Sequence, residues 1–495
     1  MFDSAEVGHA IDKKTWNAQV PGLRAALLNA QYDLAEQKKF PVVIVIGGVE
    51  GAGKGETVNL LLEWMDPRHI QVRAFPDPSD EERERPPMWR FWRALPPRGK
   101  IGILFGGWHT EPIVDRVNRN MSAAELDQRI QRIVRFERML VDEGALLLKI
   151  WFHISRAKQK ERLRALSRNP LTAWRVTKLD WKRFKQYDEY RRVSEHYIRQ
   201  TSSGEAPWIV VEGTDPRYRG LTVGKEVLAA VRERLDQKKL VATPDRTPPL
   251  LPSIDRRDVL QLLDYEKRLG KERYQKQLER WQGRLATLTR DRRFRDHAVA
   301  AVFEGSDAAG KGGAIRRITG ALDARQYEVI PIAAPTEEER AQPYLWRFWR
   351  HVPRRGRFMI FDRSWYGRVL VERVEGFAAE ADWMRAYSEI NDFEDQLGRA
   401  GLIVVKFYLA ITKPEQLKRF RLRQRTEFKR FKITAEDWRN RKKWEAYNLA
   451  SCEMIDRTST DFAPWELVAS NDKYLARIQI LKTLCRQIER ALGGK

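Results

Sequence analysis

Short, almost continuous apolar runs recur along both halves of the chain, and stretches with helical spacing of apolar residues lie between them. A run of about four to eight apolar residues is typical of a strand that is buried on both faces of a sheet. The runs that predict such strands are 42–46, 145–152 and 208–211 in the N-terminal half, and 298–303, 358–361, 402–409 and 465–468 in the C-terminal half.

A helical pattern precedes the first C-terminal strand, since residues 256–290 place leucines, Tyr274 and Trp281 at helical spacing. Buried strands that alternate with helices form a parallel sheet whose two faces are covered by helices. We therefore expect an α/β fold made of three-layer α/β/α domains, each with a parallel sheet.

The chain carries this pattern twice. Residues 48–55 return 257 positions later as residues 305–312, and the pentapeptide Trp-Arg-Phe-Trp-Arg at 89–93 returns at the same offset. A chain of 495 residues is also longer than one hydrophobic core usually serves. Four prolines near the middle forbid a regular helix or inner strand there. The expected divisions are an N-terminal domain at 1–240, a linker at 241–255 and a second domain at 256–495.

Composition restricts which partners and which cell compartment are expected. The formal net charge is +24, which predicts a polyanionic partner such as nucleic acid, inorganic polyphosphate or an acidic membrane. Only two cysteines occur, Cys452 and Cys485, so neither a disulfide framework nor a thiolate metal site is expected. No apolar run is long enough to span a membrane. We expect a cytoplasmic protein that does not enter membranes.

A glycine-rich loop follows the predicted strand 298–303 and precedes a helical pattern. Gly305 and Gly310 let the backbone curl so that its N–H groups converge on phosphate oxygens, Gly312 opens the helix, and Lys311 adds a positive charge. The position between a strand and a helix makes this GxxxxGK sequence a strong indication of a phosphate-binding loop. We predict that Gly305, Gly310 and Gly312 bind phosphate.

The loop lacks the hydroxyl that usually helps to hold Mg²⁺, because Gly312 stands where Ser or Thr is common. Asp307 in the loop and Asp362 at the end of strand 358–361 are the hard oxygen donors available instead. Arg363 and Arg368 follow Asp362 and can neutralise phosphate charge. These residues predict phosphoryl transfer, which needs metal and cations around the transferring group.

A basic segment follows strand 402–409. Residues 413–443 contain thirteen Lys or Arg and four acids, and residues 156–186 of the first copy have the same excess of nine positive charges. Arg421 and Arg425 share a helix face, and Arg419 lies on the same predicted helix. We interpret 413–443 as a helical lid that excludes water, and we predict that Arg419, Arg421 and Arg425 bind a chain of phosphates.

The two copies differ where the chemistry is expected. Phe105 and Gly106 replace Asp362 and Arg363 in the first copy, Glu50 replaces Asp307 and Glu111 replaces Arg368, although Lys54 is kept. Metal binding and charge neutralisation should both fail there. We expect the first copy to be structural, or to bind polyphosphate without turning it over.

The second copy resembles the polyphosphate kinase 2 family. Residues 305–312 look like its Walker A loop, and Phe361-Asp362-Arg363-Ser364-Trp365-Tyr366 looks like its Walker B signature. The resemblance implies a P-loop kinase-like fold, Mg²⁺ as cofactor, and catalytic roles for Asp307, Lys311, Asp362 and Arg363. Two fused domains are similar to the polyphosphate:AMP phosphotransferase branch, which converts AMP to ADP with inorganic polyphosphate. Gly367 stands where single-domain members carry Asn.

Other interpretations stay open at this point. The second copy could be a polyphosphate-dependent nucleoside diphosphate kinase or an ATP-dependent P-loop nucleotide kinase, which shares the loop and the lid. A nucleic-acid-dependent P-loop protein is less favoured, because no aromatic RNA-binding signature occurs, so no specific nucleic acid is expected. The nucleotide preference, the net direction and the formation of a homo-oligomer are left undecided by the sequence.

Overall fold

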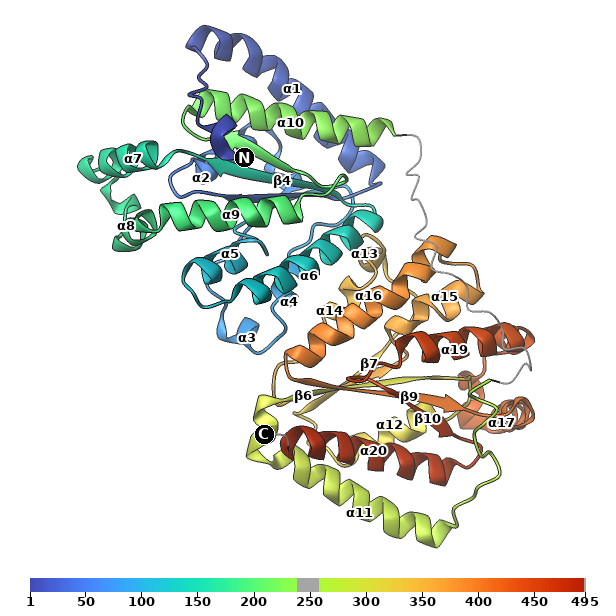
Figure 1. The fold of residues 1–495 in the computed structure, drawn as a ribbon. Helices are drawn as coiled ribbons and strands as arrows, with labels where there is room; N and C mark the ends of the chain where they lie inside the picture. Colours follow the sequence, from blue (N-terminus) through green and yellow to red (C-terminus); the bar gives the residue numbers. More distant parts are fainter. Residues whose placement is uncertain (238–257, 494–495) are drawn as a thin grey trace. The chain divides into compact units, whose positions relative to one another are not determined.

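The computed structural model describes residues 1–237 and 258–493. The predicted linker 241–255 lies outside these residues. Two compact units divide the chain: Met1–Pro78, Arg90–Val241 and Pro335–Arg347 form the first, and Ser79–Trp89, Ala242–Ala334 and Phe348–Lys495 form the second. Each unit is an α/β structure, and Figure 1 shows helices on both faces of each sheet.

Each unit contains a five-stranded sheet in which all the paired strands are parallel. The strand orders are β2-β3-β1-β4-β5 and β7-β8-β6-β9-β10, so the two copies share one topology. This confirms the predicted fold class. The strands are β1 (Val42–Gly48), β2 (Ile70–Ala74), β3 (Ile101–Phe105), β4 (Leu146–His153), β5 (Trp208–Glu212), β6 (Ala298–Gly305), β7 (Tyr327–Pro331), β8 (Phe358–Asp362), β9 (Leu402–Ala410) and β10 (Trp465–Ala469).

All seven predicted strands are present, and the sequence pattern missed β2, β3 and β7. The missed strands β2 and β7 lie at sheet edges, where several of their side chains are exposed. An edge strand needs no continuous apolar run, because one side of it faces solvent.

Helices α1 and α10 pack together on one face of the first sheet, and α6 packs on β4. In the second unit α11 and α20 form the corresponding pair and α16 packs on β9. The helices of the N-terminal half are α1 (Lys13–Gln37), α2 (Lys54–Trp64), α3 (Asp80–Arg83), α4 (Trp89–Trp92), α5 (Thr110–Val117), α6 (Ala123–Asp142), α7 (Arg156–Arg168), α8 (Lys178–Lys185), α9 (Tyr187–Thr201) and α10 (Pro216–Asp236). Those of the C-terminal half are α11 (Lys271–Arg290), α12 (Lys311–Thr319), α13 (Glu337–Arg340), α14 (Trp346–Trp349), α15 (Val371–Val374), α16 (Glu380–Arg399), α17 (Lys413–Arg425), α18 (Ala435–Lys442), α19 (Trp444–Thr458) and α20 (Lys473–Gly493).

The helix predicted over 256–290 is shorter in the structure, where α11 begins only at Lys271. Residues 258–270 form a turn at 259–262 followed by irregular backbone instead. The carboxyl group of Asp258 accepts a hydrogen bond from the Gln261 N–H, and that of Asp264 accepts from the N–H groups of Glu266 and Lys267. Such local side-chain bonds compete with the helix for the backbone donors.

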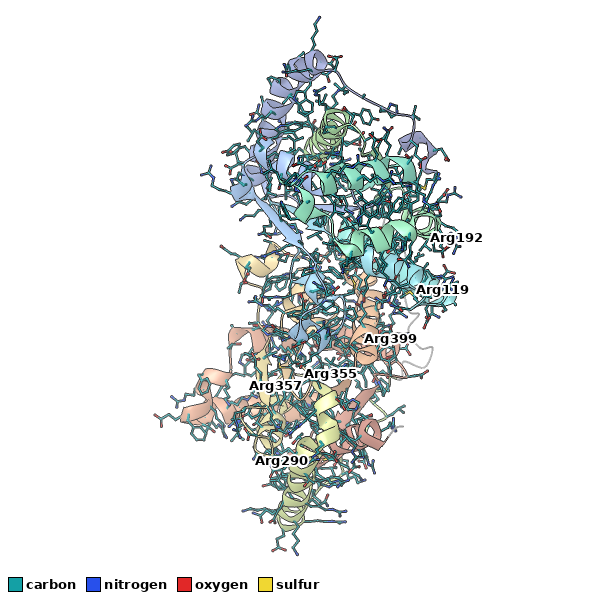
Figure 2. The ribbon with its side chains drawn as sticks, turned by 90° about the vertical axis from the view of Figure 1, so that its left-hand side faces the viewer. Arg119, Arg192, Arg290, Arg355, Arg357 and Arg399 are labelled. Atoms are coloured by element: carbon teal, nitrogen blue, oxygen red, sulfur yellow. The ribbon has the colours of Figure 1, made fainter. Side chains whose placement is uncertain are left out.

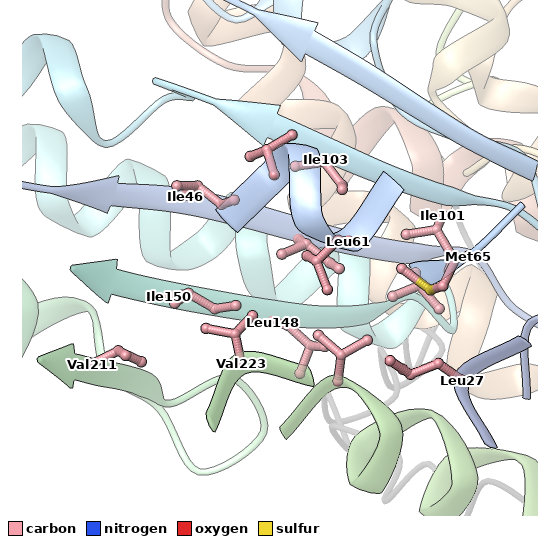
Figure 3. Packing of buried hydrophobic residues seen from close by; sticks show 14 of the residues in the cluster. Leu27, Ile46, Leu61, Met65, Ile101, Ile103, Leu148, Ile150, Val211 and Val223 are labelled. Atoms are coloured by element: carbon pink, nitrogen blue, oxygen red, sulfur yellow. The ribbon is translucent and has the colours of Figure 1, made fainter. Parts of the chain in front are cut away.

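The core of the first unit lies between the first sheet and the helices α1, α2 and α10. Figure 3 shows Leu61 of α2 and Met65, which follows the helix, packed with strand residues such as Ile103 and Ile150. An equivalent cluster in the second unit joins β6, β8 and β9 to α12 and α20. Burial on both sheet faces explains the continuous apolar runs of the central strands.

Basic side chains are spread over both units. Figure 2 labels six arginines, all of which are exposed. They come from widely separated parts of the chain, from Arg119 to Arg399. The net charge of +24 is therefore not confined to the predicted lid. No helix in the described part of the chain is long and apolar enough to cross a membrane.

Candidate active site

The glycine-rich loop lies between β6 and α12 at the carboxyl end of the second sheet. Gly305 has a φ of 127°, and a Cβ atom there would lie 2.2 Å from the carbonyl oxygen of Leu409 on the neighbouring strand. Only glycine fits this position. Gly310 is the N-cap of α12 with a φ of 113°, so the first N–H groups of the helix face the loop. The Lys311 Nζ donates to the Gly305 carbonyl at 2.6 Å, which holds the ammonium group over the loop.

Strand β8 brings Asp362 and Arg363 beside this loop. In the sheet register Asp362 is opposite Phe303, and the Arg363 N–H donates to the Phe303 carbonyl at 3.0 Å. Arg363 has a φ of 64°, a left-handed conformation that costs a non-glycine residue about 1–3 kcal/mol. The backbone thus turns sharply after Asp362 and directs the Arg363 guanidinium to Asp307, whose Oδ1 is 3.3 Å away.

Two further contacts fix the carboxylates of the loop. The Asn440 side chain on α18 donates to Asp307 Oδ2 at 3.0 Å, so Asp307 is held from two sides. The Ser364 hydroxyl donates to Glu304 at 2.8 Å. Burial raises the pKa of Glu304, and the positive charge of Lys311 offsets part of that increase.

A cleft of about 510 Å³ is lined by Asp307, Lys311, Asp362, Arg363 and Asn440. It brings together the predicted residues Asp307, Gly310, Lys311, Gly312, Asp362 and Arg363. The cations along it are Lys311, Arg316, Arg363, Arg423 and Lys432. Arg423 and Lys432 come from the basic segment, so this segment does reach the phosphate loop. Gly305 lines the adjoining pocket described below.

The other predicted phosphate ligands lie elsewhere. Arg421 and Arg425 are exposed on α17 and are not among the residues that line the cleft. The inward face of α17 carries Gln416, Arg419, Phe420 and Arg423. Arg368 pairs with Glu372 at 3.0 Å and is not among the cleft-lining residues either.

Arg419 is buried and holds the loop in place. Its guanidinium donates to the carbonyl groups of Ala308, Ala309, Ser470 and Asn471 at 2.6–3.1 Å, and its Nε donates to Glu415 at 2.7 Å. An arginine has five N–H donors, and these contacts use all of them. Arg419 therefore positions the phosphate loop and has no N–H left for a phosphate chain in this arrangement.

Sequence reasoning missed a second, smaller pocket of about 100 Å³ on the other side of Asp307. Its walls include Tyr408 on β9 and Trp444 and Tyr447 on α19. Asp307, Arg363 and Asn440 line both this pocket and the cleft. The sequence did contain a signal for this pocket, because Trp444 and Tyr447 lie three positions apart directly after the basic segment.

Sequence reasoning also missed a buried polar network that supports Trp365 and Tyr366. Lys406 in the middle of β9 donates to Glu394 at 2.7 Å, and both side chains are fully buried. Trp365 and Tyr366 donate to the same carboxylate at 2.9 and 2.7 Å. A lysine inside an apolar strand was the signal, because a buried charge requires a partner.

The first unit has the equivalent buried network but lacks counterparts of the cleft residues Asp362 and Arg363. Lys149 and Glu137 form the matching buried pair at 2.7 Å. Phe105 and Gly106 occupy the positions of Asp362 and Arg363, as the sequence indicated. Glu50 is 3.4 Å from Lys54 and 2.8 Å from Arg183, which stands where the second unit has Asn440. Lys54 lowers the pKa of Glu50 despite burial.

A parallel sheet, a glycine-rich loop before a helix, and carboxylates and cations at the same edge define a phosphoryl-transfer protein of the P-loop class. The family model described as Polyphosphate kinase 2 (PPK2) matches residues 10–239 and 268–493. The chain belongs to this family, as its motifs predicted.

Relatives over the full length agree with this. A polyphosphate:AMP phosphotransferase of Pseudomonas aeruginosa is 58% identical over 99% of both chains, and one of Pseudomonas syringae pv. tomato is 54% identical over 100% of this chain and 99% of its own. One of Acinetobacter johnsonii is 37% identical, over 94% of this chain and 95% of its own. A crystal structure from Pseudomonas aeruginosa, assigned to polyphosphate kinase 2, covers both chains fully with a TM-score of 0.90 and 56% identity.

Proposed function

We propose that the second unit transfers a phosphoryl group from inorganic polyphosphate to AMP and so forms ADP. The observation that carries this proposal is the cleft in which Lys311, Asp362 and Arg363 meet the cations of the basic segment. The full-length relatives named polyphosphate:AMP phosphotransferase support the same reaction.

The two cavities suggest a place for each substrate. Polyphosphate has no apolar surface, and the cleft of about 510 Å³ offers it five cationic side chains beside four carboxylates, two of which (Asp307 and Asp362) could hold a metal ion. The smaller pocket has aromatic walls from Tyr408, Trp444 and Tyr447, which suit part of a nucleotide acceptor. Asp307 and Arg363 line both cavities. We therefore propose that the phosphoryl group is transferred next to these two residues.

The chemical step is an in-line displacement. An oxygen of the AMP phosphate attacks the terminal phosphorus of polyphosphate, the bridging P–O bond breaks, and the chain leaves one phosphate shorter. The second pKa of a phosphate monoester is about 6, so AMP is already a nucleophilic dianion near neutral pH and needs no strong base. Lys311 and Arg363 stabilise the charge of the transferring group. Arg363 and Asn440 fix the Asp307 carboxylate beside it.

Magnesium fits the donor set. The described residues contain no group of three or more His, Cys, Asp or Glu that could hold a metal by themselves. Mg²⁺ commonly uses one or two carboxylates together with substrate phosphates, and Asp307 and Asp362 line the same cleft. These two residues would hold Mg²⁺, which supplies charge neutralisation for phosphoryl transfer. We also propose a cytoplasmic location, which suits two free cysteines.

The direct test uses radiolabelled AMP. With polyphosphate and Mg²⁺ and without ATP, the purified protein should form labelled ADP. If ADP appears only when ATP is the donor, the protein is a conventional P-loop kinase. If ADP is phosphorylated much faster than AMP, the donor is right and the acceptor is wrong.

A further inference from the structure

The first unit contains a cavity of about 560 Å³ around its own glycine-rich loop, at the carboxyl end of β4 where α7, α8 and α9 lie (Figure 1). Loss of the catalytic residues changed the chemistry of this cavity. Phe105 and Gly106 line it where the second unit has Asp362 and Arg363. Its walls are largely aromatic and apolar, with Phe75, Trp151 and Tyr190 among them. A polyphosphate chain has nothing to bury against such walls.

The cavity retains positive charge near the loop. Lys54, Lys182 and Arg183 line it together with one carboxylate, that of Glu50. The Lys54 ammonium donates to the Gly48 carbonyl at 2.8 Å and so lies over the loop as Lys311 does in the second unit. Helix α2 begins at Lys54, and its first N–H groups face the same space. The loop end therefore suits a small anionic group.

Two residues that line the cavity each carry a buried polar atom without a partner in the described part of the chain. Trp151 Nε1 and Gln159 Oε1 belong to side chains that are 2% and 3% exposed, and neither has a hydrogen-bond partner within residues 1–237 and 258–493. The matching groups in the second unit are paired. The Tyr408 hydroxyl donates to Ser451 at 2.8 Å, and Gln416 Oε1 accepts from Arg441 at 3.0 Å.

For Gln159 the cause is Phe184, which stands in the first unit where Arg441 stands in the second. A buried polar group without a partner destabilises the folded protein. The aromatic side chains Phe75, Trp151 and Tyr190 offer flat apolar surfaces on which a nucleobase can pack.

We propose that this cavity binds a nucleoside monophosphate and performs no chemistry on it. The phosphate binds at the loop with Lys54 and Arg183, and the base packs among the aromatic side chains Phe75, Trp151 and Tyr190. The chain then holds two nucleotides, one at each glycine-rich loop. This site is additional to the acceptor site proposed for the second unit.

Equilibrium dialysis of the full chain with radiolabelled AMP, without polyphosphate, counts the sites. Wild type should bind two AMP per chain, and Lys54→Ala/Arg183→Ala should bind one. The control Arg164→Ala/Lys178→Ala removes the same charge from exposed positions outside the cavity and should keep two. Val114→Trp, which fills the cavity without changing charge, should also bind one. Circular dichroism checks that each variant is folded.

Each result is decisive for this cavity. The proposal is wrong if wild type binds one AMP per chain and Lys54→Ala/Arg183→Ala still binds it. It is also wrong if wild type binds two AMP and both Lys54→Ala/Arg183→Ala and Val114→Trp still bind two. If the paired variant keeps both AMP sites and, in a separate dialysis against radiolabelled polyphosphate, loses bound polyphosphate, the cavity binds polyphosphate instead. A single AMP that disappears in the paired variant would uphold this site and contradict the acceptor pocket of the second unit.

Discussion

The buried lysine of the second unit gives a prediction whose size follows from the structure. Lys406 is fully buried, and its three N–H groups donate to Glu394, the Tyr366 hydroxyl and the Thr458 carbonyl at 2.7–2.9 Å. Replacement by methionine keeps most of the volume and leaves the Glu394 carboxylate buried without its counter-charge. Breaking one side of a buried ion pair costs about 3–5 kcal/mol. For a unit of this size that lowers the melting temperature by roughly 6–20 °C.

Scanning calorimetry at pH 7 tests this decrease in melting temperature. The matched variant Lys149→Met should destabilise the first unit in the same way. The double variant Lys406→Met/Glu394→Gln removes the unpaired charge and keeps an acceptor for Trp365 and Tyr366. It should recover at least half of the loss. A decrease of less than 2 °C for Lys406→Met, or a double variant no more stable than the single one, would refute the reasoning. Activity should fall with stability, because Trp365 and Tyr366 come only one residue after the pair Asp362 and Arg363.

Three further predictions concern catalysis, the lid and pH. Lys311→Ala should lower kcat by roughly 100-fold or more, whereas Lys54→Ala should have a mild effect, so equal losses in steady-state assays would show two working sites. Arg423→Glu should raise the KM for polyphosphate more than Arg421→Glu, most clearly at low salt, since only Arg423 lines the cleft, and equal effects would contradict this geometry. Burial lowers the pKa of His109, so the unfolded chain takes up this proton more readily and the first unit loses stability as the pH falls below about 6.5. His109→Tyr should reduce that slope by up to about 1.4 kcal/mol per pH unit in urea unfolding, and an unchanged slope would disprove the assignment.

Much of the fold could be predicted because its central strands are buried on both faces. Such strands need continuous apolar runs, and these mark β1, β4, β6 and β9 in the printed sequence. The edge strands β2 and β7 escaped because solvent relaxes that requirement. The turns before α11 escaped because Asp258 and Asp264 form local bonds that compete with an otherwise helical pattern.

The sequence by itself determined the duplication, the parallel sheets, the glycine-rich loop and the loss of Asp362 and Arg363 from the first copy. Each of these features can be read from short segments of the chain, either from adjacent residues or from the comparison of two segments 257 positions apart. The tertiary structure alone decided which arginines of α17 face the loop. That helix carries charges on every side, so its inward face is set only by packing against Ala308 and Ser470. It also decided that Arg419 is a buried support, and that a lysine in one strand meets a glutamate from a different element, because such contacts join residues that only folding brings together.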